Sequence, residues 1–512
     1  MSLGRARAVA LVGLTGVPVD VEVDARSGLP GMSLIGMPDR ALGEAVERVR
    51  SALGNSGCDL PARRLTINLS PAALPKQGSG FDLAIALAVL AALGIVPREG
   101  VAATVFVGEL ALDGRLRPTA GVLPAVLAAR DAGVHTVVVP TANSAEAALV
   151  TGIRSLGMSS LREVAIHAGA RISVKPVEPL LQSEQSFESD HTPELSDLAD
   201  VIGQSDAIDG LITAAAGGHH LFLLGPPGSG KTMLAKRLPG ILPELSTEEA
   251  MQVACVRSLS QAVNLTTIDL RPPFEAPHHT ATAAALVGGG SVIRPGAVTR
   301  ASGGVLFLDE APEFHASVLD CLREPLETGS VTILRATTRA TFPARFQLVM
   351  AANPCPCGNY GMPRSECSCA PMARRRYLAR LSGPLLDRVD IRLTVARATT
   401  SRGPMANDAP VTSAQVRDRV IIARGAARER LRQTPWTINA DVAGAYLTGS
   451  NLRLPRSVTK PIDMGVERGN LSLRGYDRVL RVAWTIADLD GSTSPSLEHV
   501  GRALFLRQGV PT

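Results

Sequence analysis

The feature that most constrains the fold is a glycine-rich loop between an apolar run and a helical pattern. The run Leu221–Leu224 has the composition of a buried strand. Glycines let the following loop curl so that backbone N–H groups face phosphate oxygens, and the next helix presents its positive end to them. Lys231 can reach β- and γ-phosphates, and the Thr232 hydroxyl can ligate Mg²⁺. The order strand, loop and helix predicts an α/β fold that binds a nucleoside triphosphate. The loop itself reads Gly225, Pro226, Pro227, Gly228, Ser229, Gly230, Lys231, Thr232.

A second apolar run supplies the carboxylates that such a site requires. Val305–Leu308 is followed directly by Asp309 and Glu310. A continuous apolar run is typical of a parallel strand that is buried on both faces. At its carboxyl end Asp309 is expected to hold Mg²⁺ beside Thr232, and Glu310 is expected to polarise the attacking water. A core strand that ends in two solvated acids is the alternative, but the glycine-rich loop in the same chain favours the catalytic interpretation.

Size and composition limit the class of protein. With 512 residues the chain can form about two to four domains. The net charge of +5 is compatible with a nucleic-acid partner but does not identify one. The longest apolar run, residues 83–96, is shorter than the roughly 20 residues that cross a bilayer. Alternating apolar and acidic residues over 17–24 predict a strand near the start and argue against a targeting peptide. We therefore expect a cytoplasmic protein without a membrane segment.

The chain divides into three predicted domains and a linker. The first domain mixes alternating strands with apolar helices, including a helix over Asp82–Leu93. The last contains helical patterns at Ser413–Leu431 and Arg474–Ala487. A serine- and glutamate-rich stretch of low periodicity separates the first domain from the second. The predicted units are residues 1–170, the linker 171–195, the nucleotide-binding α/β domain 196–397 with a cysteine-rich insert at 355–369, and the helical domain 398–512.

Motifs around the loop resemble a known family. Asp197–Gln204 resembles the adenine-side segment of AAA+ ATPases, and three further motifs resemble the magnesium-chelatase-like branch of that superfamily. Together with the N-terminal domain they resemble the ComM/YifB family over nearly the whole chain. The resemblance implies an AAA+ core with a helical lid, ATP and Mg²⁺ as cofactors, and a hexameric ring that moves DNA, as a branch-migration helicase does. The three motifs are Ala276–Thr280, Gly288–Gly290 and Arg294–Gly296.

The resemblance also suggests roles for three polar residues outside the loop. Asn353 matches the sensor-1 position, where an amide orients the attacking water; a turn-forming Asn before proline is the alternative. Arg388 resembles the arginine finger, which acts on the γ-phosphate of a neighbouring subunit. Arg474 resembles the sensor-2 arginine of the lid. For both arginines the alternative is a solvated surface side chain.

Residues Gly329–Arg345 are predicted to form a β-hairpin just before the sensor-1 position. Related ring ATPases project such a hairpin into the central pore, where Arg335 and Arg339 would bind DNA phosphates without sequence specificity. A solvated hairpin with scattered arginines is the alternative. The adjacent His278 and His279 are a family marker to which we assign no role.

Four of the seven cysteines fall within one short segment, in two C-x-C pairs with nine residues between them. Four thiolates in one loop suit tetrahedral Zn²⁺. One-residue gaps are less usual than two-residue gaps, and reduced structural thiols or a redox function are the alternatives. A cytosolic location argues against two disulfides. The four candidate ligands are Cys355, Cys357, Cys367 and Cys369.

The N-terminal domain resembles the Lon-type protease domain, a fold of the ribosomal S5 domain 2-like α+β class, but it lacks the catalytic dyad. The motif over Gly108–Pro118 carries the resemblance. In the matching register Gly80 replaces the nucleophilic serine and Pro124 replaces the activating lysine. Neither residue can act as nucleophile or base, and Ser79 lies one residue out of register without a lysine partner. The domain is therefore expected to support assembly or nucleic-acid binding.

Three functions follow from these features. The leading hypothesis is an ATPase that couples hydrolysis to DNA translocation in recombination or DNA uptake. The second is a chelatase-type ATPase that remodels a protein partner, and the third, an ATP-dependent protease, is nearly excluded by Gly80 and Pro124. Stimulation of ATP hydrolysis by DNA would favour the first hypothesis, and stimulation by a protein alone would favour the second.

Overall fold

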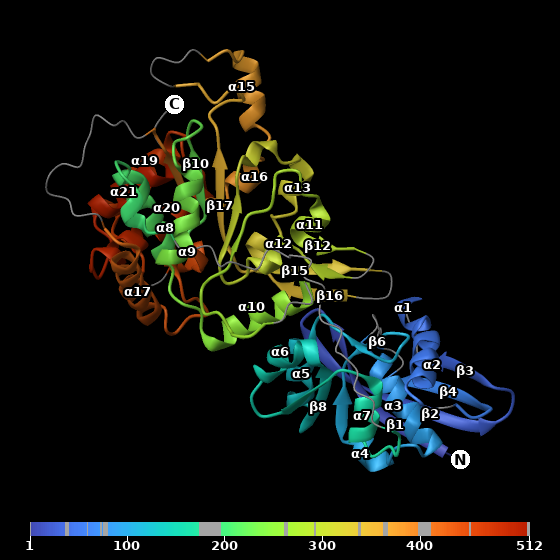
Figure 1. The fold of residues 1–512 in the computed structure, drawn as a ribbon. Helices are drawn as coiled ribbons and strands as arrows, with labels where there is room; N and C mark the ends of the chain where they lie inside the picture. Colours follow the sequence, from blue (N-terminus) through green and yellow to red (C-terminus); the bar gives the residue numbers. More distant parts are fainter. Residues whose placement is uncertain are drawn as a thin grey trace.

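The computed structural model contains two separate helix-covered sheets and a C-terminal group of helices (Figure 1). Residues 174–195 of the predicted linker, residues 398–410 and Ser79 lie outside the described residues. Among the described residues no helix is both long and apolar enough to cross a bilayer. The structure describes residues 2–35, 40–58, 60–71, 74, 80–173, 196–260, 265–290, 293–335, 339–361, 367–397, 411–449 and 452–508.

The N-terminal part is built on a seven-stranded mixed sheet with the strand order β3-β4-β2-β1-β5-β8-β9. Alternation along the second strand directs Val19, Val21 and Val23 into the core and the acids between them outward. The predicted helix over Asp82–Leu93 is confirmed as α3, which is buried almost all round. The strands of this sheet are β1 (Ser2–Val12), β2 (Thr15–Ser27), β3 (Gly31–Ile35), β4 (Arg63–Ser70), β5 (Thr104–Phe106), β8 (Thr136–Pro140) and β9 (Arg154–Met158), and β6 (Glu109–Leu110) and β7 (Leu116–Arg117) form a separate pair. The helices are α1 (Arg40–Gly43), α2 (Ala45–Asn55), α3, α4 (Arg98–Ala102), α5 (Val122–Asp131), α6 (Ser144–Ala148) and α7 (Leu161–His167).

The central part contains a five-stranded sheet with the order β11-β14-β17-β10-β18, in which every neighbouring pair is parallel. Apart from Gln347 at the start of β17, its inner strands are apolar, because separate hydrophobic clusters cover the two faces. The strands are β10 (Leu221–Leu224), β11 (Phe274–Glu275), β14 (Val305–Leu308), β17 (Gln347–Ala352) and β18 (Ile391–Thr394), with short pairs β12 (Gly288–Gly289) to β13 (Arg294–Pro295) and β15 (Ser330–Leu334) to β16 (Arg339–Pro343). The helices are α8 (Ser205–Gly217), α9 (Lys231–Ile241), α10 (Thr247–Ser260), α11 (Ala283–Val287), α12 (Ala297–Arg300), α13 (Ala316–Asp320), α14 (Pro325–Thr328), α15 (Pro371–Leu378) and α16 (Gly383–Leu386).

The C-terminal helices share one hydrophobic core with α8, α9 and one face of the central sheet. A partly buried ion pair reinforces this packing: Arg478 Nη1 lies 2.5 Å from Asp390 Oδ1, and the Asp390 carboxylate is 2% exposed. The helical prediction for this region is confirmed. Its helices are α17 (Ser413–Arg430), α18 (Gly444–Gly449), α19 (Arg456–Glu467), α20 (Leu473–Leu489) and α21 (Leu497–Gln508).

Helix α10 of the central part packs against the N-terminal part (Figure 1). Its Ala254 and Cys255 pack into a cluster of N-terminal side chains. The Gly121 N–H donates to the Ser258 carbonyl at 2.9 Å, and the Leu123 N–H lies 3.4 Å from the Ser258 hydroxyl oxygen. The start of α5 is therefore held by α10 from the other half of the chain.

Candidate nucleotide-binding site

The glycine-rich loop runs from the end of β10 to the start of α9, as the sequence predicts. Gly230 precedes the first helical residue with φ of 92°, a conformation that residues with a Cβ rarely adopt. At Gly225, a Cβ would lie 2.2 Å from the Val395 carbonyl oxygen. Glycine is therefore required at both ends of the loop for it to curl beneath the sheet edge.

The Lys231 ammonium is held at the centre of the loop by neutral oxygen atoms. Nζ donates to the carbonyls of Gly225 at 2.6 Å and Pro226 at 2.9 Å, and to Asn353 Oδ1 at 3.1 Å. Burial lowers the pKa of Lys231, and the negative charges of Asp309 and Glu310 oppose that shift. The Asn353 amide and the loop lysine are thus in direct contact, although Lys231 begins α9 and Asn353 follows β17.

Thr232 and Asp309 also meet, because β10 and β14 flank β17 and end at the same edge of the sheet. The Thr232 hydroxyl donates to Asp309 Oδ2 at 2.7 Å. A hydroxyl and a carboxylate at this distance match the oxygen donors that Mg²⁺ takes from a protein alongside substrate phosphates. The donor set therefore fits the ion, with Thr232 and Asp309 as the residues that would hold it.

Glu310 lies beyond this pair in a strained backbone conformation. Its φ is 50°, and it is the single described residue other than glycine with positive φ. Its N–H donates to Asp309 Oδ1 at 2.9 Å, and its carboxylate lies 3.5 Å from His279 Nδ1. His279 is a site neighbour to which sequence reasoning assigned no role. The sequence signal that could have identified it is its position shortly after β11, the strand beside β14.

Gln204 is a second residue whose contact the sequence did not reveal. Its Nε2 donates to the Ser229 carbonyl at 2.5 Å, and its Oε1 is buried without a hydrogen-bond partner among the described atoms. The segment that resembles the adenine-side region therefore holds the phosphate loop directly.

Neither predicted arginine contacts the loop within this chain. Arg388 forms an ion pair with Glu327 and donates to the Pro384 carbonyl at 2.6 Å. Arg474 is exposed at the start of α20, one turn before the partly buried Arg478. The structure thus brings together Lys231, Thr232, Asp309, Glu310 and Asn353, and leaves Arg388 and Arg474 apart from them.

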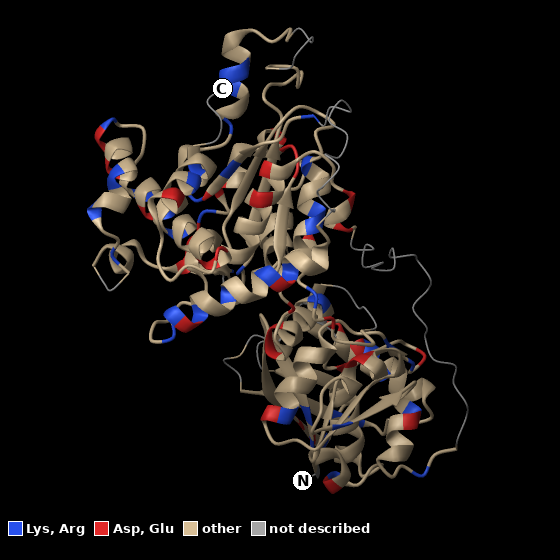
Figure 2. Cartoon of the chain, turned by 90° about the vertical axis from the view of Figure 1, so that its left-hand side faces the viewer, with Lys and Arg blue, Asp and Glu red and all other residues tan. Residues whose placement is uncertain are grey.

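The predicted hairpin is present as the antiparallel pair β15 and β16. Arg335 and Arg339 are both exposed near its turn, and the Arg335 guanidinium donates to the Gly290 carbonyl. Residues 336–338 lie outside the described residues. Further positive charge gathers on α15, which projects from the central part and includes Arg374, Arg375 and Arg376 (Figure 2).

The four predicted cysteine ligands come together. Their sulfur atoms all lie within 4.8 Å of one another, and three pairs are 3.4 to 3.7 Å apart. Tetrahedral Zn²⁺ with bonds of about 2.3 Å would separate its sulfur ligands by about 3.8 Å. A hydrogen bond from the Asn359 backbone, followed by those from Cys355 and Cys369, lowers the pKa of Cys357 to about 6. The cluster can bind a metal ion, and its donors suit zinc.

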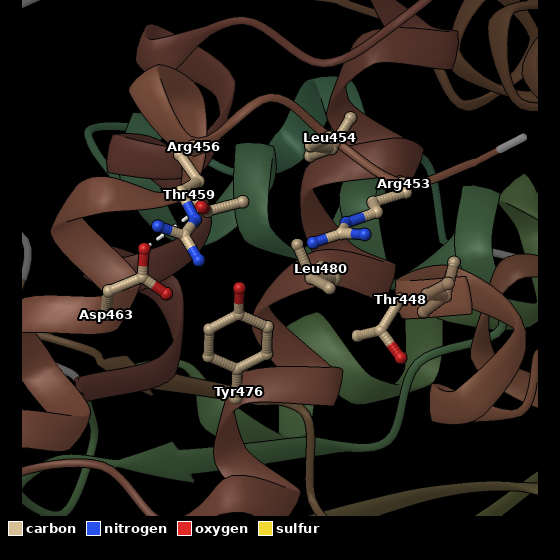
Figure 3. Close-up of a pocket in the computed structure, with 9 residues that line it drawn as sticks. Thr448, Arg453, Leu454, Arg456, Thr459, Asp463, Tyr476 and Leu480 are labelled. Atoms are coloured by element: carbon tan, nitrogen blue, oxygen red, sulfur yellow. Dashed lines mark hydrogen bonds between the residues drawn. The ribbon is translucent and has the colours of Figure 1, made fainter. Parts of the chain in front are cut away.

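The positions that match the Lon dyad carry no reactive group. Gly80 precedes α3, and Pro124 is buried in α5. A separate cavity of about 210 Å³ lies among the C-terminal helices, lined by Arg453, Arg456 and Tyr476, and contains none of the predicted site residues (Figure 3).

Comparisons with known proteins agree with this architecture. Residues 197–402 match the family model for magnesium chelatase, subunit ChlI, residues 21–143 match subunit ChlI of Mg-chelatase, and residues 410–507 match the ChlI C-terminal region. The chain is 41% identical to the competence protein ComM of Haemophilus influenzae over 100% of this chain and 98% of that one. It is 39% identical to the uncharacterized protein YifB of Escherichia coli over 99% and 97%.

A partial match covers the N-terminal part alone. Over 147 residues the chain is 33% identical to the Lon protease of Mycolicibacterium smegmatis, which corresponds to 27% of this chain and 18% of that protease. With an α/β phosphate-loop core, a helical C-terminal region and full-length relatives at this identity, the chain belongs to the ComM/YifB family of magnesium-chelatase-like AAA+ proteins.

Proposed function

We propose that the protein is an ATPase that couples Mg·ATP hydrolysis to the movement of DNA. The observation that carries the proposal is the convergence of Lys231, the Thr232–Asp309 pair and Asn353 at one sheet edge. Lys231 would bind the β- and γ-phosphates, Thr232 and Asp309 would hold Mg²⁺, and Glu310 would accept a proton from the attacking water. Mg²⁺ supplies charge neutralisation at the phosphates when bound.

DNA is the proposed substrate of the motor, in the manner of a branch-migration helicase in the cytoplasm. The exposed Arg335 and Arg339 on one hairpin and the basic α15 support a phosphate-binding surface. The name of the Haemophilus relative, a competence protein, supports a role near DNA uptake. The test is the steady-state ATPase rate without DNA and with single-stranded, duplex or branched DNA. Stimulation by DNA supports the proposal, and equal rates in all four conditions contradict it.

The position of Arg388 supports assembly into a ring, which we propose to be hexameric. Because its guanidinium pairs with Glu327 and not with its own loop, Arg388 would complete the site of a neighbouring subunit. In that case Arg388→Ala subunits mixed with Lys231→Ala subunits should recover activity, because mixed interfaces combine an intact loop with an intact arginine. Mixtures that never exceed the activity of either variant alone would contradict action between subunits.

A chelatase-type ATPase that remodels a protein is the second candidate. The matches to subunit ChlI along the chain favour it. The same assay separates the two functions, because a motor of this second kind would respond to a protein partner and not to DNA.

We also propose that the four clustered cysteines hold structural Zn²⁺. The sulfur spacings support four-coordinate binding with no position left for substrate. Elemental analysis of freshly purified, reduced protein should find about one zinc per chain, and its absence would favour reduced thiols instead.

A further inference from the structure

The cysteine cluster lies against the phosphate loop. Gly358, which follows the first cysteine pair, has φ of 78°. A Cβ on Gly358 would lie 2.5 Å from Pro227 Cδ and 2.6 Å from Pro227 Cγ. The proline ring cannot rotate away, because it is closed onto the backbone nitrogen. The two loops therefore touch with no space for a side chain, and the position of Gly358 limits where Pro227 can lie.

The turn that presents Gly358 is part of the cluster itself. Its N–H donates to the Cys355 carbonyl at 2.9 Å, and the Cys355 side chain is fully buried. On its other side, the Pro227 carbonyl accepts a hydrogen bond from Arg397 Nε at 3.1 Å. Pro227 thus lies between the end of the nucleotide-binding part and the cysteine turn, and a displaced turn would leave one side of the phosphate loop without support.

Both ends of the cysteine segment are also attached to Asn353. Cys355 follows Asn353 by two residues at the end of β17. At the other end, α15 begins two residues after Cys369, and the hydroxyl of its buried Tyr377 is hydrogen-bonded to the Asn353 backbone. Since Asn353 Oδ1 accepts from Lys231 Nζ at 3.1 Å, the cluster has a second connection to the phosphate-binding lysine.

We propose that a metal ion bound by the four cysteines is a structural part of the nucleotide site and sets its affinity for ATP. The ion would hold Gly358 against Pro227 and keep Asn353 beside Lys231, because four sulfur ligands would tie the two cysteine pairs to one centre. The inference rests on the proposed ATPase function. It adds that loss or oxidation of the thiolates weakens nucleotide binding without altering any phosphate-binding residue.

The first experiment compares the wild-type chain with Cys369→Ala. Zinc content is measured by elemental analysis, nucleotide affinity by equilibrium titration with a fluorescent ATP analogue, and fold by circular dichroism. We expect the variant to lose the metal and to bind the analogue roughly tenfold more weakly, which corresponds to about 1.4 kcal/mol. A folded variant that has lost its metal but binds as tightly as wild type overturns the inference.

A matched pair of glycine variants tests the contact independently of the metal. Gly358 and Gly361 have the same φ of 78°, but no described atom lies within 4 Å of a Cβ on Gly361. Gly358→Ala should keep its zinc and lose affinity to a similar extent as Cys369→Ala, whereas Gly361→Ala should keep both. Equal affinities for the two glycine variants would show that the contact with Pro227 does not matter, even if Cys369→Ala fails to fold.

The controls also distinguish this inference from the proposed ATPase function on which it depends. If the wild-type chain with its metal does not bind the analogue, the proposed ATPase is wrong and the inference falls with it. If the wild type binds the analogue and the metal-free variant binds it equally tightly, the ATPase proposal stands. Only the proposed coupling between the metal and nucleotide affinity is then wrong.

Discussion

Two aspartates beside the two sheets show how differently the same residue type can be used. Asp82, at the start of α3 in the N-terminal part, is fully buried and accepts bonds from Arg48 Nε at 2.8 Å, Arg48 Nη2 at 3.1 Å and the Leu110 N–H at 3.2 Å. Asp309, at the end of β14, is partly exposed and bonds to a hydroxyl and a backbone N–H. Asp82 is paired with an arginine, whereas the lysine whose charge interacts with Asp309, Lys231, donates its hydrogen bonds to neutral oxygen atoms.

The two sheets also differ in what the described residues place at their candidate site positions. In the central sheet, three neighbouring parallel strands end at one edge, and each delivers a polar residue there. In the N-terminal sheet, the positions that match a protease dyad are Gly80 and Pro124. Among the described residues, similar layers of helix and sheet thus gather candidate phosphate- and metal-binding groups in the central part, whereas the matched dyad positions of the N-terminal part carry no reactive side chain.

The largest effect is expected for Lys231→Ala, which removes the positive charge at the centre of the loop. ATP turnover should fall by about 10²–10³-fold or more, because an electrostatic contact to the phosphates is lost. Lys236→Ala, on the exposed face of the same helix, is the control and should keep wild-type turnover. Phosphate-release kinetics measure both, and equal losses would mean that charge on α9 matters without a specific phosphate contact.

A somewhat smaller loss is expected for Glu310→Gln, which preserves shape but removes the base. General-base removal costs about 10²–10⁴-fold in rate, while binding of ATP should persist because the loop and the Mg²⁺ donors are intact. Single-turnover hydrolysis and equilibrium binding separate the two effects. A variant that hydrolyses ATP at the normal rate would remove Glu310 from the mechanism.

The comparison predicts that Asp82 affects stability and not turnover. Burial raises the pKa of Asp82 to about 6, and its bonds to Arg48 only partly offset this. The folded state therefore binds the proton more tightly than the unfolded chain, whose value is near 3.8, and stability falls as pH rises from about 4 to about 6. The total change is on the order of 3 kcal/mol.

Asp82→Asn mimics the protonated form at every pH and should remove this dependence. Denaturant unfolding of both proteins at about pH 4 and pH 7 should show the variant gaining relative stability at the higher pH. A constant difference between the two proteins would contradict the raised pKa. ATP turnover of the variant should match wild type under conditions where both are folded.

The sequence predicts well those features that depend on local patterns. The apolar runs at Leu221–Leu224 and Val305–Leu308 form strands with the same limits, and Asp82–Leu93 forms a helix. These elements could be predicted because burial of one or more faces requires a regular pattern of apolar residues. The grouping of Lys231 with Asn353 could also be expected, since strand ends of a parallel sheet meet at one edge.

Contacts between distant segments could not be predicted in this way. The bond from Gln204 to the Ser229 carbonyl, the ion pair of Arg388 with Glu327 and the contact of Gly358 with Pro227 depend on how loops pack after the sheet has formed. No periodicity records such contacts, because each involves one residue from a segment that has no regular pattern.

One edge of the central sheet is proposed to bind the triphosphate together with Mg²⁺. The most direct measurement is an experimental structure of the chain with Mg²⁺ and a non-hydrolysable ATP analogue. We expect phosphate oxygens within hydrogen-bond distance of Lys231 Nζ and the ion between the Thr232 hydroxyl and Asp309. A nucleotide bound elsewhere, or none bound at saturating concentration, would contradict the account.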